Sequence, residues 1–132
     1  MDGGDPFALQ RFADAQAGGV HEGALAELKA GAKRSHWMWF IFPQHVELGH
    51  SQTAKFYGLS GVDEARAYLS HPLLGDRLLD CCDALLPHLR AGLGAEEIFG
   101  SIDAMKLKSS MEIFAEAKPE ETRFRELLGL LG

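Results

Sequence analysis

The stretch that most constrains the fold of this chain is SHWMWFIFPQ, residues 35–44. It holds both tryptophans of the protein and two of its eight phenylalanines, and Pro43 lies near its end. Aromatic side chains bury a large area, and a folded protein rarely leaves so many of them in water. We therefore expect this segment to lie beneath other structure and to take His36 and Gln44 inward with it. Buried polar groups of this kind need partners.

On either side of this segment the chain has helical patterns and almost no strand signal. The nearly continuous apolar run over 37–42 does not distinguish a strand from a buried helix. A leucine-rich stripe at three- and four-residue spacing predicts a long helix from His71 to Arg90 with one buried face. Capping and turn residues predict further helices that begin at Asp5-Pro6 and over 23–34, 51–57, 60–69, 101–117 and 120–131, with N-terminal caps at Asp5, at Ser51 and in a Ser60–Asp63 capping box.

These patterns predict an all-α protein without a significant sheet. A length of 132 residues suits one compact domain with a single core. We expect that domain to span residues 1–132 and to contain about six to eight helices, judged from the helical periods along the chain. Residues 1–4 are expected to form a disordered N-terminus.

Composition disfavours several classes of function. The formal net charge of −6 argues against general binding to nucleic acid or to an anionic membrane surface. No apolar run approaches the roughly 20 residues that span a bilayer, and the N-terminus lacks the features of a signal peptide. Cys81 and Cys82 are adjacent, so they predict neither a disulfide framework nor a cysteine-based zinc site. We expect a cytoplasmic protein that binds neither nucleic acid nor membrane.

The helix predicted over 101–117 carries a polar stripe on its inward side. Asp103, Lys106 and Ser110 fall at i, i+3 and i+7, between two apolar arcs of the same helix. One interpretation is a structural network, in which Asp103 pairs with Lys106 inside the protein. The other is a ligand pocket, in which Lys106 faces a phosphate or carboxylate, Ser109 and Ser110 offer hydroxyls, and Asp103 accepts a hydrogen bond or acts as a base.

Several strings in sequence order resemble the bacterial family catalogued as domain of unknown function 1810. They include Asp5-Pro-Phe, Arg11-Phe12, the 35–44 stretch, His71-Pro-Leu-Leu-Gly75, Asp103, Lys106 and Ser109-Ser110. The resemblance covers nearly the whole chain and implies a mainly α-helical single domain without an established activity. Some members carry the label calpastatin, the name of a long, largely disordered protease inhibitor, which does not suit a compact, apolar-rich chain. The chain departs from the family pattern at Glu47-Leu48-Gly49 and at Glu112-Ile113-Phe114.

The histidines do not predict a metal site. His45 and His50 have Glu47 between them, but this is not a standard metal-ligand spacing and no cysteine assists. His36 differs from the others because the aromatic run is expected to bury it, either as a core histidine or as an acid–base group in a cleft. No phosphate-binding glycine loop or dinucleotide fingerprint occurs, so the sequence identifies no cofactor.

Two functional hypotheses remain. The first is a pocket between the aromatic segment and the 101–117 helix for a small, phosphate-bearing or nucleotide-like ligand. Its candidate catalytic residues are His36, Asp103 and Lys106, and its candidate binding residues are Trp37, Trp39, Gln44, Ser109 and Ser110. Whether it would be an enzyme stays open, and both tryptophans also suit plain core packing. The alternative is a non-catalytic protein-interaction module, with an unidentified partner, whose buried polar residues are structural.

Overall fold

The computed structural model describes residues 4–131 as an all-helical single domain, which confirms the predicted fold class. Within this range nine α-helices occur, six of them with seven or more residues, and the only strand-like pairing is an isolated bridge between His45 and Leu59. None of the helices in residues 4–131 has the length and apolar character needed to cross a membrane. Residues 1–3, part of the segment expected to be disordered, lie outside the described residues. The elements are α1 (Gln10–Gln16), α2 (Val20–Lys29), α3 (Met38–Ile41), a 3-10 turn (Val46–Leu48), α4 (Gln52–Phe56), α5 (Val62–Ser70), α6 (Leu74–Arg90), α7 (Ala95–Phe99), α8 (Ser101–Ala117) and α9 (Thr122–Leu131).

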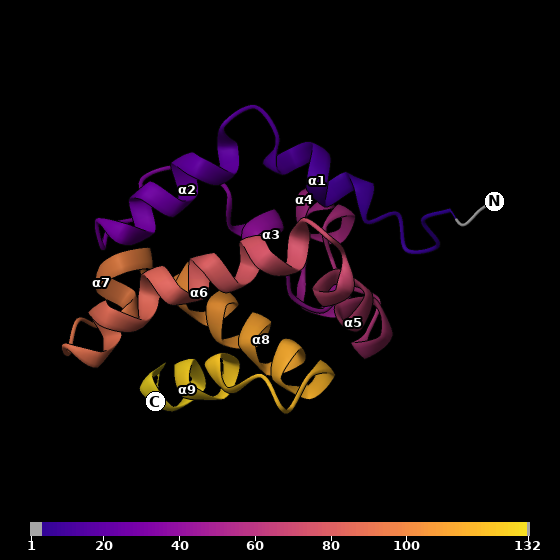
Figure 1. Ribbon diagram of the computed structural model, residues 1–132. Helices are drawn as coiled ribbons and strands as arrows, with labels where there is room; N and C mark the ends of the chain where they lie inside the picture. The colour runs from indigo at the N-terminus through magenta and orange to yellow at the C-terminus, as the bar shows by residue number, and fades with distance from the viewer. Residues whose placement is uncertain (1–3, 132) are drawn as a thin grey trace.

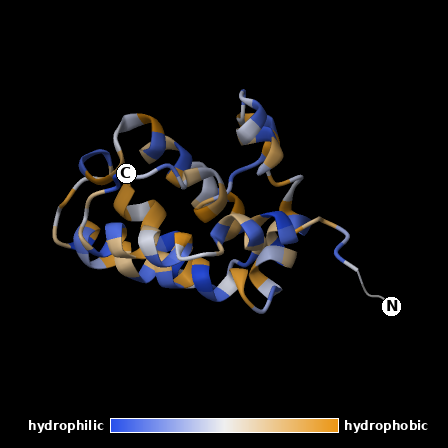
Figure 2. Cartoon of the chain, turned by 90° about the horizontal axis from the view of Figure 1, so that it is seen from above, coloured by the Kyte–Doolittle hydropathy of each residue, from blue (hydrophilic) through white to orange (hydrophobic). Residues whose placement is uncertain are grey.

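Helix α6 runs through the middle of the molecule (Figure 1). It contacts helices α2, α5 and α9. Helix α8 packs against α5, α7 and α9. The leucine stripe predicts the buried face of α6 correctly: Leu74, Leu78, Leu85, Leu86 and Leu89 are all buried. Figure 2 shows hydrophobic and hydrophilic residues on the same helices, as expected when one face is inside and the other in water.

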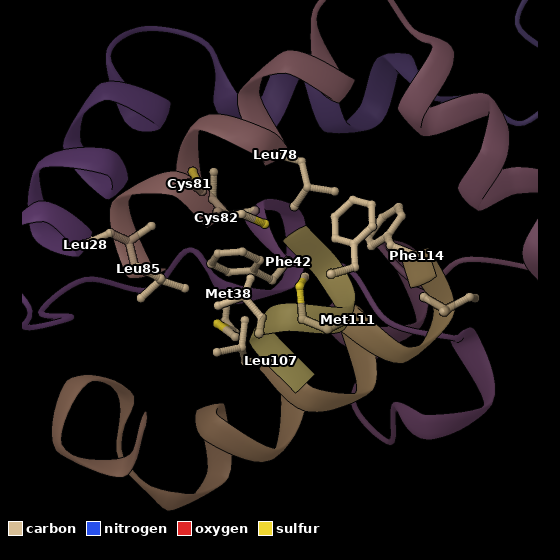
Figure 3. Close-up of a cluster of buried hydrophobic side chains, with 14 of the residues drawn as sticks. Leu28, Met38, Phe42, Leu78, Cys81, Cys82, Leu85, Leu107, Met111 and Phe114 are labelled. Carbon is tan, nitrogen blue, oxygen red and sulfur yellow. The ribbon is translucent and has the colours of Figure 1, made fainter. Parts of the chain in front are cut away.

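The central core forms where side chains from α2, α3, α6 and α8 meet (Figure 3). Among them, Leu28, Met38, Phe42, Leu85 and Leu107 are at most 1% exposed. Cys81 and Cys82 are free thiols in the same core, and burial raises the pKa of Cys81 to about 12. Burial also raises the pKa of Cys82, so both thiols stay protonated at neutral pH and serve as packing residues.

Two predicted helices have different bounds in the structure. The first helix begins at Gln10 and not at Pro6, because Ala8 has a φ of 54°, which an α-helix does not accommodate. The N-cap residue of α1 is Leu9, so the prediction of Asp5 at that position was wrong, but the Asp5 carboxylate still accepts hydrogen bonds from the Leu9 and Gln10 N–H groups at the start of the helix, at 2.7 Å each. The second helix runs from Val20 to Lys29 and not over 23–34, which leaves residues 30–37 as a loop.

Other boundaries and caps were predicted with mixed success. The α8 bounds match the prediction, and the Ser51 hydroxyl accepts a hydrogen bond from the Ala54 N–H at 3.0 Å, as a capping serine should. The predicted Ser60–Asp63 capping box was wrong in its partner, because Glu64 accepts from both the N–H and the hydroxyl of Ser60. Helix α7 was not predicted, since five residues carry too little of a period to be recognised.

The aromatic segment forms a single helical turn, α3, whose flanks are buried with it. Trp37, Met38, Ile41 and Phe42 are 1–2% exposed, which confirms that the segment lies beneath other structure. His36 is exposed, so the expectation that the aromatic run carries it inward was wrong. His36 precedes the helical turn and belongs to the exposed part of the loop, residues 34–36, so only from Trp37 onward does the chain enter the core.

Candidate ligand site at the aromatic segment

Glu27 on α2 holds the loop that leads into the aromatic segment. Its carboxylate accepts hydrogen bonds from the Arg34 N–H (2.7 Å), the Ser35 N–H (3.0 Å), the Ser35 hydroxyl (2.6 Å) and the indole N–H of Trp37 (3.0 Å). Burial alone would raise the pKa of Glu27, but these hydrogen bonds outweigh it and lower the pKa to about 2. Glu27 therefore fixes both the path of the loop and the orientation of Trp37.

The same loop brings Lys33 to α8. The Lys33 N–H donates to the Ile98 carbonyl at 2.8 Å, and its ammonium lies 2.9 Å from the Asp103 carboxylate and 5.1 Å from the centre of the Trp37 ring. Only 9% of the Lys33 side chain is exposed. The Asp103 carboxylate and the negative face of the Trp37 indole ring stabilise the ammonium of this buried lysine.

Lys106, one turn along α8 from Asp103, gives that carboxylate a second cation. Its ammonium lies 3.5 Å from the other Asp103 oxygen and 5.1 Å from the centre of the Trp39 ring. The Asp103 and Lys106 side chains are 19% and 25% exposed. Two lysines thus share one carboxylate, so this cluster of Lys33, Asp103 and Lys106, which we call the lysine pair site, carries an excess of one positive charge.

A small cavity lies beside Lys106. Met38, Trp39, Phe42, Gln44, Ala54, Tyr57 and Lys106 line it, and its volume is about 10 Å³. One water molecule needs roughly 10–15 Å³ by this measure, so the cavity is at the lower limit for a single water. Anything larger requires the lining to move, and the Lys106 side chain is the most flexible part of it.

Ser110 is buried, and its hydroxyl has no hydrogen-bond partner among the described residues. It lies one turn beyond Lys106 on the same face of α8, as the i, i+3, i+7 stripe requires. An unpaired buried hydroxyl costs about 1–3 kcal/mol relative to a paired one. Ser109, its neighbour, is partly buried.

The structure brings together some of the predicted site residues and separates others. Asp103, Lys106, Trp39 and Gln44 converge at the lysine pair site and its cavity, and Ser110 lies on the same helix face. Trp37 is buried and its indole N–H is already bonded to Glu27, so it offers no open ring face. Exposed His36 stands apart from the cavity lining.

Sequence reasoning missed Lys33 and Glu27. The helix predicted over 23–34 contains Lys33 near its end, whereas the helix in the structure ends four residues earlier, at Lys29. Glu27 bonds residues seven to ten positions further along the chain, a spacing that matches no helical or capping pattern. Neither residue carries a local signal for its role.

The low pKa of Glu27 makes the folding stability of the protein depend on pH. Because its pKa in the folded state is about 2 and its ordinary value is 4.5, the stabilisation is present above pH 4.5 and is lost as the pH falls toward 2. We expect this carboxylate to contribute about 1–2 kcal/mol of that loss, since solvent screens part of the interaction. Urea unfolding at several pH values measures this dependence. In Glu27→Gln, the free energy of unfolding should change less between pH 2 and 4.5 than in the native chain, whereas Glu22→Gln on the same helix should behave as the native chain does. An unchanged slope in Glu27→Gln would contradict this assignment.

Three of the other histidines, His21, His45 and His71, make local or core contacts. The His71 Nδ1 accepts hydrogen bonds from the Leu73 and Leu74 N–H groups and so caps α6, and the His45 Nδ1 accepts from the Glu47 N–H. His21 is buried, with its Nε2 3.9 Å from the Cys81 sulfur, and burial lowers its pKa. In the described part of the chain no three His, Cys, Asp or Glu side chains are grouped so that they could hold a metal ion.

Comparison with known proteins supports the fold without adding an activity. Residues 6–130 match the family described as "Protein of unknown function (DUF1810)". The crystal structure of the conserved hypothetical protein Rv1873 from Mycobacterium tuberculosis is similar, with 48% sequence identity and a TM-score of 0.89. The match covers 95% of this chain and 87% of that one. No curated protein matches this chain.

Proposed function

Because this chain belongs to the DUF1810 family, whose description assigns no activity, we propose a function from its own site: reversible binding of a small phosphate-bearing anion at the lysine pair site. The observation that carries the proposal is that Lys33 and Lys106 share the single carboxylate of Asp103, beside the partly exposed ring of Trp39. An anion that joins this cluster completes the neutralisation of two cations that are already held in place.

Burial makes this charge effective. The lysine side chains are 9% and 25% exposed, so water screens their field less than it screens a surface lysine. The protein as a whole carries a formal charge of −6, which repels anions from most of its surface. A positive cluster inside an acidic protein therefore selects small anions over nucleic acid, whose many phosphates would meet the acidic surface.

Trp39 adds a reason to favour a nucleotide-like ligand. Its ring is partly exposed, and the Lys106 ammonium covers one face of it. When Lys106 swings from the ring to a phosphate, that face becomes free to stack on a base, and base–aromatic stacking contributes about 1–3 kcal/mol. The Gln44 amide, which lines the same cavity, adds a hydrogen-bond donor from the predicted set. Since the cavity of about 10 Å³ must widen first, we expect binding of moderate affinity with a conformational step.

A non-catalytic interaction module remains the second candidate, and one observation favours it. Asp103 and both lysines satisfy one another inside the protein, and the adjoining cavity is nearly closed. In that case the cluster only fixes how the 30–37 loop packs against α8. Both candidates suit the cytoplasm, where we place this protein because Cys81 and Cys82 are free thiols.

Isothermal titration with ATP, AMP, inorganic pyrophosphate and adenosine tests the proposal. We expect heat of binding with the phosphate-bearing compounds and none with adenosine, and a loss of affinity of at least about 10-fold in Lys106→Gln, the order expected when a charge-assisted hydrogen bond is removed. Trp39→Phe should weaken the binding of AMP more than the binding of pyrophosphate, because only AMP has a base that can stack on the ring.

The matched control is Lys118→Gln, since Lys118 is an exposed lysine directly after α8. This variant should bind as the native chain does. Two results together would support the structural interpretation instead. The native protein would bind none of these compounds, and Lys106→Gln would unfold at a lower temperature than Lys118→Gln.

A further inference from the structure

Residues of α7, of the first turns of α8 and of the C-terminal end of α9 line one groove. These three segments lie at one end of the molecule (Figure 1). Met105 and Ile102, at 72% and 70%, are the most exposed large hydrophobic side chains in residues 4–131. Met105 lines a shallow groove of about 540 Å³ together with Ala95, Ala104, Leu130 and Leu131. We call Ile102 and these groove residues the α7–α9 patch.

Exposed Ile102 and Met105 are three residues apart on α8, so they are neighbours on one face of that helix. Two large apolar side chains this exposed, next to a groove that is lined by Ala95, Ala104, Leu130 and Leu131 as well as by charged residues, are typical of a protein-binding surface. The groove is open and broad, whereas small-ligand pockets enclose most of their ligand. A protein surface is therefore a better occupant than a small molecule.

The charges around the groove point to a second copy of this chain as that occupant. Glu96 comes from α7 and Lys108 from α8, and both line the groove. Within the part of the chain that the structure describes, neither side chain forms an ion pair. An unpaired anion on one helix and an unpaired cation on another allow the two reciprocal ion pairs of an isologous contact, Lys108 of each copy with Glu96 of the other.

We propose that this protein forms a symmetric homodimer through the α7–α9 patch. Met105 and Ile102 of one copy pack into the groove of the other, and Lys108 of each copy faces Glu96 of its partner. A stable interface buries roughly 800 Å² on each partner, so the contact extends beyond the groove across Ile102. The dimer is independent of ligand binding at the lysine pair site.

Sedimentation velocity over a protein concentration range of about 1–200 μM, the range of affinities common for small interfaces, tests the dimer. We expect the mass to rise toward twice the monomer mass of 14.4 kDa as the concentration increases. Met105→Glu should remain monomeric at every concentration, and its circular dichroism should be unchanged because Met105 is 72% exposed.

Charge reversal tests the two-fold arrangement itself. Lys108→Glu and Glu96→Lys should each shift the equilibrium to monomer, because like charges then face each other in both halves of the contact. The double variant should recover the dimer, since each copy again meets an opposite charge. The exposed Lys55 on α4 supplies the control, and Lys55→Glu should leave the dimer intact. A native chain that is monomeric throughout, or a double variant that stays monomeric, would overturn the proposal.

Discussion

Glu64→Ala is expected to lower the free energy of unfolding by about 3–5 kcal/mol, the range seen when one partner of a buried ion pair is removed. Glu64 is 3% exposed and its carboxylate lies 2.8 Å from the Arg11 guanidinium. It also accepts the N–H and the hydroxyl of Ser60, at 2.9 Å each. Alanine leaves these three donors and a largely buried positive charge without their acceptor.

Arg11 makes this loss large because it joins distant parts of the chain. Its guanidinium donates to the carbonyls of Phe7, Ala8, Phe56 and Gly58, and lies 4.3 Å from the centre of the Phe12 ring. The Arg11–Glu64 pair therefore connects the N-terminal segment to the α4–α5 connection. When Glu64 is lost, the charge of Arg11 either stays buried without a counter-ion or pulls this junction apart to reach water.

Urea unfolding at pH 7 measures the effect, and the chain provides a matched control. Glu126 pairs with Arg90 at 2.6 Å, but this pair is at the surface. Glu126→Ala should change stability far less than Glu64→Ala, although the distance in the pair is shorter, because solvent screens an exposed pair. Equal effects of the two substitutions would show that burial does not determine the contribution of Glu64.

Gly75→Ala is expected to destabilise the protein by about 3 kcal/mol, at the upper end of the cost of overpacking a core. An alanine Cβ at this position would lie 2.1 Å from the carbonyl oxygen of Leu69 and 2.9 Å from the carbonyl carbon of the same residue. Both are backbone atoms at the end of α5, which a rotamer change does not move. The end of α5 and the start of α6 must therefore separate, although both pack on α8 or its neighbours.

Gly23 supplies a control of opposite sign. It lies inside α2 with open space around an added Cβ, so Gly23→Ala should stabilise the protein by about 1 kcal/mol through its helix propensity. Thermal and urea unfolding of both variants measures the difference. A Gly75→Ala variant as stable as the native chain would mean that α5 and α6 tolerate a wider separation than their close approach implies.

The proposed site and the core share the aromatic segment. Trp37 and Phe42 pack edge-on or tilted against each other and against Phe99, with ring centres 6.2–6.3 Å apart. Trp39 lies on the same helical turn but faces Lys106 at the protein surface. The packed aromatic core thus supports the partly exposed Trp39 ring from below.

Local pattern was enough to predict the helical class, the buried stripe of α6, the bounds of α8 and the cap at Ser51. These features depend on residues within a few positions of one another, where helical period and capping chemistry act directly. The same period correctly placed Ser110 inside and brought Lys106 and Asp103 together on one helix face. It could not tell whether the aromatic segment is a strand or a helical turn, because both accept a short apolar run.

Only the tertiary structure decided which groups meet across distant parts of the chain. The exposure of His36, the approach of Lys33 to Asp103, and the close contact of Gly75 with Leu69 all depend on the path of a loop or the separation of two helices. Those quantities result from packing the whole core at once, since each helix takes the position that buries the faces of its neighbours. No window of neighbouring residues contains that information.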